Sequence, residues 1–281
     1  MQLPASVTIE KQNDNTIFVI DNELASAKIS LFGAQVFSFI PKEDDIERLW
    51  LSPLTKVDAT ETIRGGTPVC WPWFASQYPN NDTSLPMHGF ARSQKWELIS
   101  AKDVDSHTLL IFNCPTTSGK GFPHQAELQL EVLVGAQLRM TLITKNTGNE
   151  AFEFTGALHT YFAVDDINRI EIIGVDGEYK DKNRDMAWFN APETYRIQGP
   201  NDCIHFSQNA RLLIDQSTGN AISVNAAGHD SIVIWNPWKG AKDIANIPDD
   251  GYLRFLCIES AVTKGITLQP KNSHSLVQNI G

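Results

Sequence analysis

Paired cysteines, net positive charge and long apolar runs are all scarce in this chain of 281 residues. Its four cysteines, Cys70, Cys114, Cys203 and Cys257, are far apart and form no C-x-x-C pair. The sequence therefore predicts reduced thiols rather than a disulfide framework or a cysteine metal site. The net charge of −10 argues against non-specific nucleic-acid binding, which needs a basic footprint. A phosphorylated substrate is still possible, because two or three arginines at one site suffice to bind it.

Signals for export or membrane insertion are also missing. The first residues, MQLPASVTIEKQNDN, have neither a basic start nor an apolar core, and no run approaches the roughly 18 apolar residues of a membrane span. With 42% hydrophobic and 20% charged residues, the composition is that of an ordinary soluble protein. No internal repeat, low-complexity tract or linker interrupts the chain. We therefore expect a cytoplasmic protein without a membrane partner, folded as a single domain over residues 1–281.

Convincing helices are few, and period-two alternation dominates. In Glu127–Val134, leucine and valine side chains fall on one face and polar side chains on the other, and a Gly135-Ala136 link leads into Gln137–Asn146. This pattern predicts a β-hairpin with one buried face. Without alternating helices, the chain favours a large antiparallel sandwich. The other expected strands are Thr16–Asp21, Ala27–Phe32, Gln35–Ile40, His107–Asn113, Phe152–Val164, Ile170–Val175, Ala210–Asp215, Ile222–Asn225, Ser231–Trp235, Tyr252–Ser260 and Ile266–Gln269, with single helical turns at Ala187–Asn190 and Ala241–Ala245.

A stretch rich in glycine, proline and aromatic residues runs from Arg64 to Arg92, RGGTPVCWPWFASQYPNNDTSLPMHGFAR. It combines two arginines, a Trp-Pro-Trp-Phe run and His88. The planar guanidinium suits phosphate or carboxylate, and tryptophan offers a large apolar face with a polar edge. The stretch therefore suits a polar ring substrate with an anionic group. The alternative is a loop of packed tryptophans with solvated arginines.

Two predicted strands place a titratable side chain where it could take part in catalysis. On Phe152–Phe162, His159 shares a polar face with Tyr161, although a lone histidine on a strand is usually structural. On Tyr252–Ala261, Glu259 alternates with Phe255, Cys257 and other apolar residues. Glutamate is seldom buried without a partner, and loss of solvation raises its pKa toward that of a useful general base. A bulge that turns Glu259 outward, or a buried salt bridge, would explain the pattern without catalysis.

Other enzyme classes lack their motifs. The seven histidines show no H-x-x-x-H or H-E-x-x-H spacing, which argues against a zinc enzyme. The sequence also has no G-x-S-x-G elbow and no P-loop, so hydrolase and nucleotide-kinase functions have no support. The spacing of the histidines therefore predicts no metal site.

Five motifs in order, RGGTPVCWPWF, LPMHGFAR, GALHTYF, WNPW and CIESA, resemble the hexose-6-phosphate mutarotases of the aldose 1-epimerase superfamily. The resemblance spans about residues 20 to 275. It implies an all-β, galactose-mutarotase-like supersandwich with the sugar site on a broad concave face. It also implies cofactor-free chemistry at C1 of a phosphorylated hexose, with glucose 6-phosphate as the first candidate. We expect a small-molecule substrate, no nucleic-acid partner, and a monomer or weak oligomer.

The resemblance also assigns roles to individual residues. His159 matches the general acid, Glu259 the general base, His88 a contact to the sugar, and Arg64 and Arg92 the phosphate clamp. Trp73 of the W-P-W-F run is a further candidate for substrate binding. Asp202 stands at a hydroxyl-binding aspartate, but Cys203 and His205 replace the arginine and tyrosine of the usual D-R-[VI]-Y pattern. The Ala75–Pro79 loop also departs from the usual W-P-W-F-G run, so the rim of the site is expected to differ.

Two rival functions remain open on the sequence. A mutarotase for free hexoses would use Arg64 and Arg92 only structurally. A carbohydrate-binding sandwich without catalysis would keep the tryptophans and arginines but would not need Glu259 on an apolar face.

Overall fold

The computed structural model describes residues 2–207, 211–215 and 221–281, and antiparallel strands dominate them. A four-stranded sheet has the order β1 (Val7–Gln12), β2 (Asn15–Asp21), β3 (Ala25–Ser30), β4 (Gln35–Pro41). A seven-stranded sheet has the order β13 (Ala187–Asn190), β12 (Glu178–Asp181), β14 (Asn201–His205), β17 (Ser231–Asn236), β18 (Phe255–Leu268), β10 (Phe152–Ala163), β5 (Val69–Cys70). An eight-stranded sheet has the order β11 (Glu171–Ile173), β15 (Arg211–Asp215), β16 (Ala221–Ala227), β19 (Ser273–Ile280), β9 (Leu138–Asn146), β8 (Ala126–Val134), β7 (His107–Asn113), β6 (Glu97–Val104).

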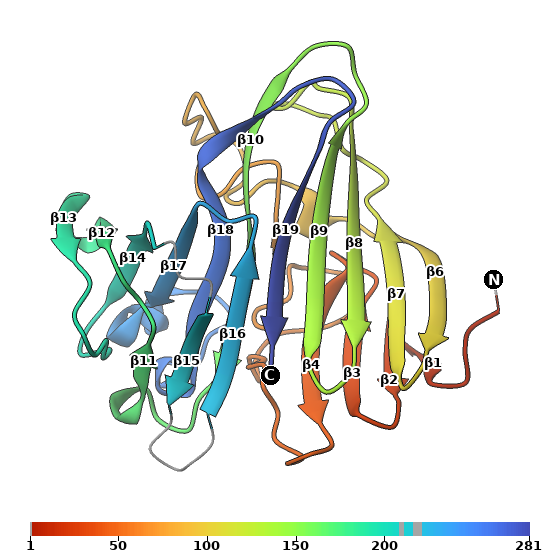
Figure 1. The fold of residues 1–281 in the computed structure, drawn as a ribbon, viewed down its shortest axis with the longest axis horizontal. Helices are drawn as coiled ribbons and strands as arrows, with labels where there is room; N and C mark the ends of the chain where they lie inside the picture. The colour runs from red at the N-terminus through yellow and green to blue at the C-terminus, as the bar shows by residue number, and fades with distance from the viewer. Residues whose placement is uncertain (1, 208–210, 216–220) are drawn as a thin grey trace.

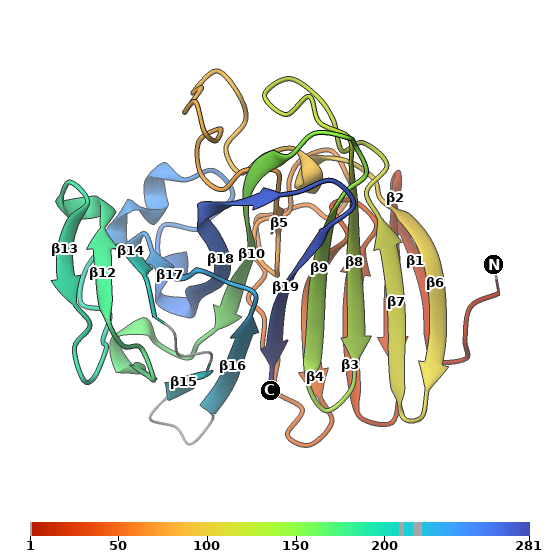
Figure 2. The ribbon, with the colours of Figure 1, turned by 45° about the horizontal axis from the view of Figure 1, so that its top comes forward.

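The sheets stack as a sandwich. The eight-stranded sheet faces the viewer in Figure 1, with the four-stranded sheet behind β6 to β9. Figure 2, turned by 45°, shows the seven-stranded sheet extending away from this pair, with β12 and β13 at its outer edge. One apolar cluster takes buried side chains from all three sheets, among them Ile29, Met140 and Leu158. The large antiparallel β-sandwich expected from the sequence is therefore confirmed.

Strand alternation explains the best-predicted elements. β8 and β9 form the expected hairpin, in which Val134 pairs with Leu138 and every second side chain of β8 is buried. Apolar residues at period two lie on one face of a strand, so burying that face fixes the register. β7 has the predicted bounds, and β2, β4, β10 and β17 lie within two residues of theirs.

Other predicted elements were wrong or missed. Ala187–Asn190 is strand β13, not a helical turn, and it pairs with β12 along its whole length. Tyr252–Ser260 and Ile266–Gln269 are not two strands: residues 251–254 form the 3-10 helix η5 (Gly251–Arg254), and β18 runs unbroken from Phe255 to Leu268. Ala210 of the predicted strand Ala210–Asp215 lies outside the described residues. The missed strands are β1, β5, β6, β12, β14 and β19.

The remaining regular structure is a set of short 3-10 helices: η1 (Ala91–Ser93), η2 (Ile167–Arg169), η3 (Lys182–Arg184) and η4 (Trp238–Asp243). The predicted turn Ala241–Ala245 overlaps η4. All four cysteines are free and buried, as the sequence predicts. Within the described ranges, no helix combines the length and the apolar character that crossing a membrane requires.

Candidate active site

The central strands of the seven-stranded sheet carry a histidine and a glutamate side by side. His159 of β10 pairs in register with Glu259 of β18, which in turn pairs with Val233 of β17. Residues opposite each other on neighbouring strands point to the same face. On this face, His159 Nε2 lies 3.2 Å from Glu259 Oε1. The sequence thus placed both residues on the correct face, although 99 residues lie between them in the chain.

Tyr161 and Trp235 enclose the histidine. Tyr161, two residues further along β10, stacks on the His159 ring with centroids 5.1 Å apart, and Trp235 meets that ring edge-on at 6.0 Å. The register of β10 shifts between Phe154 and Gly156, so the predicted alternation holds only beyond this bulge. Of the polar face predicted on this strand, His159 and Tyr161 line a cavity. These aromatic walls fix the imidazole orientation.

Burial determines the protonation of the pair. Glu259 is 1% exposed, and removal from water raises the pKa of its carboxyl well above 4.5. Burial, assisted by the positive charges of Arg92 and Arg64, lowers the pKa of His159 well below 6.5. Both shifts favour the uncharged forms, a state in which the pair has one exchangeable proton and no net charge. Glu259 Oε2 and His159 Nδ1 have no hydrogen-bond partner among the described residues. Two side chains that share one proton can donate a proton from one of them and accept a proton on the other.

The cavity around this pair has a volume of about 320 Å³. It brings together six of the seven predicted site residues, from both the glycine-rich stretch and the strands. Its lining is Arg64, Phe74, Ala75, Met87, His88, Arg92, His159, Tyr161, Lys182, Asp202, Val233, Trp235, Ile244 and Glu259. A volume of this size falls in the range of small-molecule sites.

Trp73 is the exception among the predicted site residues. Its side chain is 1% exposed, packs in the main apolar cluster and donates from Nε1 to the carbonyl of Pro86 at 2.8 Å. The structure therefore places Trp73 in the core behind the site rather than in the cavity wall. Phe74 and Trp235 supply the aromatic surfaces instead.

Backbone contacts with Trp71 fix the position of the segment that carries His88. Gly89 has φ of 72°, and a Cβ there would lie 2.0 Å from the carbonyl oxygen of Trp71. That oxygen accepts hydrogen bonds from the backbone N–H groups of Phe90 and Ala91. Because only glycine fits at this position, the H-G-F-A-R motif closes against the Trp71 backbone and directs His88 and Arg92 into the cavity.

A hydrogen bond also sets the tautomer of His88. Nδ1 accepts from the backbone N–H of Ala75 at 3.2 Å, which leaves the proton of the neutral ring on Nε2. Burial and the nearby charges of Arg92, Lys182 and Arg64 lower the pKa of His88 to about 3. His88 is therefore a fixed hydrogen-bond donor and not a base. Ala75, which stands where glycine was expected, adopts φ of 59°.

Three cations line the cavity. Arg64 donates to the hydroxyl of Tyr161 at 3.2 Å, and Arg92 donates to the carbonyl of Met87 at 3.0 Å. Within the described ranges neither arginine forms a salt bridge, whereas Lys182 contacts Asp202 at 3.0 Å. Burial raises the pKa of Asp202, and the charge of Lys182 opposes that rise. With the His159–Glu259 pair and His88 neutral, three cations against the Asp202 carboxylate leave an excess of two positive charges.

Some residues that line the cavity were not predicted as site residues, because their positions in the sequence mark them less clearly. Trp235 belongs to the WNPW motif and Tyr161 to the predicted polar face, so both could have been selected. Lys182 follows β12 in a charged segment, EYKDKNRD, where nothing in the spacing marks it. Cys203 and His205 of β14 alternate with Asp202 and do not line this cavity. His205 is instead fully buried between Tyr179 and Tyr195, and burial lowers its pKa to about 3.

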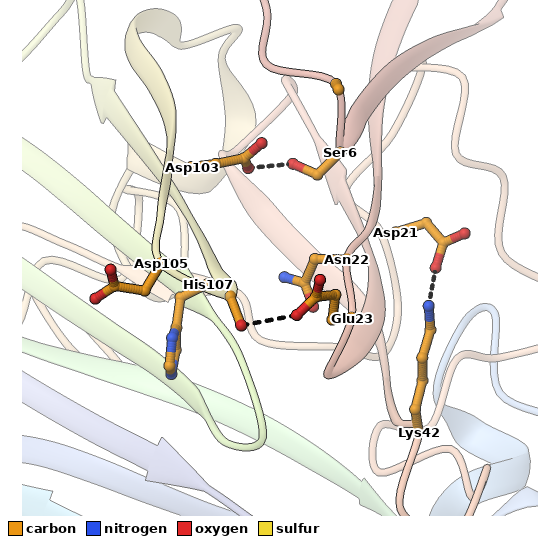
Figure 3. Close-up of a pocket in the computed structure, with 10 residues that line it drawn as sticks. Ser6, Asp21, Asn22, Glu23, Lys42, Asp103, Asp105 and His107 are labelled. Carbon is orange, nitrogen blue, oxygen red and sulfur yellow. Dashed lines mark hydrogen bonds and ion pairs between the residues drawn. The ribbon is translucent and has the colours of Figure 1, made fainter.

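A second cavity, of about 410 Å³, lies away from these residues (Figure 3). Most of its charged groups pair with one another or with hydroxyls. Lys42 contacts Asp21 at 2.7 Å, and Ser106 donates to Glu23 at 2.8 Å. Ser6 donates to Asp103 in the same way. In the part of the chain that the structure describes, no group of three or more His, Cys, Asp or Glu side chains could hold a metal ion.

Comparisons with known proteins identify the family of this chain. The family model described as Aldose 1-epimerase matches residues 16–281. Two curated relatives are named "Putative glucose-6-phosphate 1-epimerase". The one from Escherichia coli is 32% identical over 92% of this chain and 87% of its own. The one from Salmonella typhimurium is 31% identical over the same shares.

Solved structures show the same fold. A structure titled as a putative mutarotase from Salmonella typhimurium superposes with a TM-score of 0.91, at 29% identity, over 99% of this chain and 94% of that one. A galactose mutarotase-like protein from Clostridium acetobutylicum gives 0.74 at 15% identity over 99% of both chains. The second likeness concerns the fold alone.

Proposed function

This chain belongs to the aldose 1-epimerase family and is therefore a mutarotase, an isomerase that acts on sugars; we propose that its substrate is a hexose 6-phosphate, with glucose 6-phosphate first. The excess of two positive charges in the cavity carries this proposal. Arg64 and Arg92 face the space beside His159 and Glu259 without salt bridges among the described residues. A phosphate dianion would balance their charge. The names of the curated relatives support the same substrate class.

The proposed reaction needs one base at the C1 hydroxyl and one acid at the ring oxygen, two atoms bonded to the same carbon. The proton that the pair shares first passes from Glu259 to His159 Nε2. Glu259 then takes the proton of the C1 hydroxyl while His159 gives its proton to the ring oxygen. The C1–O5 bond breaks, and the open-chain aldehyde rotates about C1–C2. The same steps in reverse then close the ring as the other anomer. Each proton transfer contributes typically ~10²–10⁴-fold to the rate. The pair starts and ends with the same single proton, so the enzyme is ready for another cycle.

The other lining residues would hold the sugar in register. His88 presents its Nε2 proton to a sugar oxygen, because its Nδ1 is already occupied by Ala75. Arg64 and Arg92 bind the phosphate, remote from C1. This contact orients the reacting carbon toward the catalytic pair. Asp202 accepts hydrogen bonds from the sugar hydroxyls.

Polarimetry on a freshly dissolved anomer tests the substrate. Adding the protein to α-D-glucose 6-phosphate should accelerate the change in optical rotation far more than adding it to α-D-glucose or α-D-galactose. Equal acceleration of glucose and glucose 6-phosphate would identify a free-hexose mutarotase. No acceleration of any sugar, with binding retained, would indicate a carbohydrate-binding protein.

Arg92→Ala should raise KM for glucose 6-phosphate by roughly 10- to 100-fold and change KM for free glucose little. A hydrogen bond to a charged group contributes ~1.5–3 kcal/mol, and each ~1.4 kcal/mol is tenfold in affinity. Arg196→Ala is a matched control, because Arg196 pairs with Glu171 and lies outside this cavity. An equal loss on both sugars would show that Arg92 does not recognise phosphate.

The pH dependence of kcat/KM should show a broad plateau across neutral pH. Activity requires one proton on the His159–Glu259 pair. Because burial lowers the pKa of His159 well below 6.5, a second proton binds only in acid, and the acid limb should lie below pH 6.5. Because burial raises the pKa of Glu259 well above 4.5, the last proton leaves only at higher pH, which sets the alkaline limb. An acid limb at or above pH 6.5 would contradict a desolvated histidine; ionisation of the substrate phosphate is measured separately.

A further inference from the structure

Lys182 is a cavity cation to which neither the motifs nor the reaction described above assign a role. It is the first residue of η3, directly after the short strand β12 near the outer edge of the seven-stranded sheet. Its Nζ lies 3.0 Å from Asp202 Oδ1 and 5.3 Å from the centroid of the Phe74 ring. The ammonium group is thus held between a strand residue and the aromatic wall of the cavity.

The Asp202 carboxylate is oriented by this contact. Asp202 pairs in register with Trp235 on β17, and Trp235 pairs with Cys257 on β18, two residues from Glu259. Since strands lie about 4.8 Å apart and residues on one face repeat about every 7 Å, Asp202 stands across β17 from Glu259, on the same face. Lys182 occupies Oδ1, and Oδ2 makes no hydrogen bond to the described residues. One carboxylate oxygen therefore remains available on the side of the cavity opposite His159.

The charge of Lys182 matters because Asp202 is largely withdrawn from water. The side chains of Lys182 and Asp202 are 28% and 27% exposed. A carboxylate in such a place loses solvation, and a close cation stabilises its charged form. A charged carboxylate accepts hydrogen bonds but cannot donate them, whereas a protonated one presents a donor to the same hydroxyl. Lys182 therefore favours the form of Asp202 that accepts hydrogen bonds from the sugar.

We propose that Lys182 is a positioning residue: it holds Asp202 as an oriented acceptor for the sugar hydroxyls remote from C1 and thereby places C1 against the His159–Glu259 pair. The inference rests on the proposed function only in that a sugar occupies the cavity. It does not require the sugar to carry a phosphate. Lys182 acts through Asp202, while Arg64 and Arg92 remain for an anionic group.

A double-mutant cycle tests this role. Lys182→Met, Asp202→Asn and the double variant are assayed by polarimetry with α-D-glucose 6-phosphate and with α-D-glucose. Lys182→Met should raise KM by about tenfold or more, the size of a lost charged hydrogen bond, with a smaller change in kcat. Lys182→Arg should recover most of the loss, because arginine can keep the contact with Oδ1. In the Asp202→Asn background, Lys182→Met should change KM by less than about twofold, because interacting side chains are not additive.

Lys264→Met is the matched control. Lys264 lies 4.5 Å over the Phe206 ring, outside the cavity, and its loss should leave KM and kcat unchanged. The same loss in both Asp202 backgrounds would overturn the proposal, because Lys182 would then act without Asp202. A loss confined to glucose 6-phosphate would also overturn it and make Lys182 part of the phosphate clamp. If free glucose proves the better substrate, the hexose-phosphate proposal fails while the cycle on glucose still decides the role of Lys182.

Discussion

His159→Asn is expected to lower the rate of anomerisation by at least ~10²-fold while the fold is retained. Asparagine keeps a polar side chain opposite Glu259 but cannot carry a proton to the ring oxygen. The aromatic neighbours Tyr161 and Trp235 also pack on Phe255, so the wall around the lost ring stays supported. Polarimetry gives the rate, and circular dichroism with thermal melting checks the fold.

His205→Asn provides the control for this experiment. His205 is a fully buried histidine of the same sheet, and burial lowers its pKa as it does for His159. It does not line the cavity. The His205 variant should therefore keep the turnover of each folded molecule, whatever its melting temperature. Near-normal catalysis by His159→Asn would remove His159 as the acid and make His88 the candidate.

Glu259→Gln should nearly eliminate activity and leave the melting temperature equal or higher. The amide cannot act as a base, but it can donate to His159 Nε2 as the protonated carboxyl does. A neutral amide is also easier to bury than a carboxylate without full hydrogen bonding, and Glu259 Oε2 has no partner among the described residues. Catalytic groups often reduce stability in this way.

The stability gained by Glu259→Gln should also depend on pH in a defined direction. Burial raises the folded-state pKa of Glu259 well above 4.5. As pH rises past 4.5, the unfolded chain ionises this carboxyl while the folded chain keeps it protonated, so folding loses stability. Glu259→Gln removes that loss. Its advantage in free energy of unfolding should therefore grow with pH above 4.5, until the folded carboxyl ionises too.

Glu47→Gln is the contrasting variant. Glu47 is a partly buried carboxyl outside the cavity that accepts hydrogen bonds from Ser38 Oγ, Phe39 N and Leu49 N. An amide satisfies these donors less well, so this variant should melt earlier and retain activity. If Glu259→Gln instead melts much earlier and still turns over, Glu259 is structural and the proposed reaction has no base.

The site was predictable where strand alternation and motif agreed. His159 and Glu259 lie beyond the bulge of β10, where the alternation is regular, and the register of β10 with β18 brings them together on one face. Alternation failed where no face is fully buried. β6 is mostly exposed, β13 is a short edge strand and β12 is the short strand beside it, so their side chains carry no apolar period. Lys182 was missed for this reason, because its position depends on β12.

Trp73 illustrates a different limit. Trp71, Trp73 and Phe74 stand together in the sequence, and composition alone cannot tell which ring faces the cavity. The backbone turns so that Trp71 and Trp73 enter the core and Phe74 lines the cavity. Such a division depends on long-range packing, including the hydrogen bond from Phe74 N to Thr155 Oγ1 on β10.

The register that pairs His159 with Glu259 also bears on how the chain acquires activity during folding. The proposed acid and the proposed base come from segments 100 positions apart, and β10 and β18 must close that loop before the two side chains meet. Closing long loops costs chain entropy, and sheets built from distant strands fold slowly. No local hairpin of this protein contains the catalytic pair. Return of activity on refolding therefore reports formation of the seven-stranded sheet, and partly folded chains with native hairpins remain inactive.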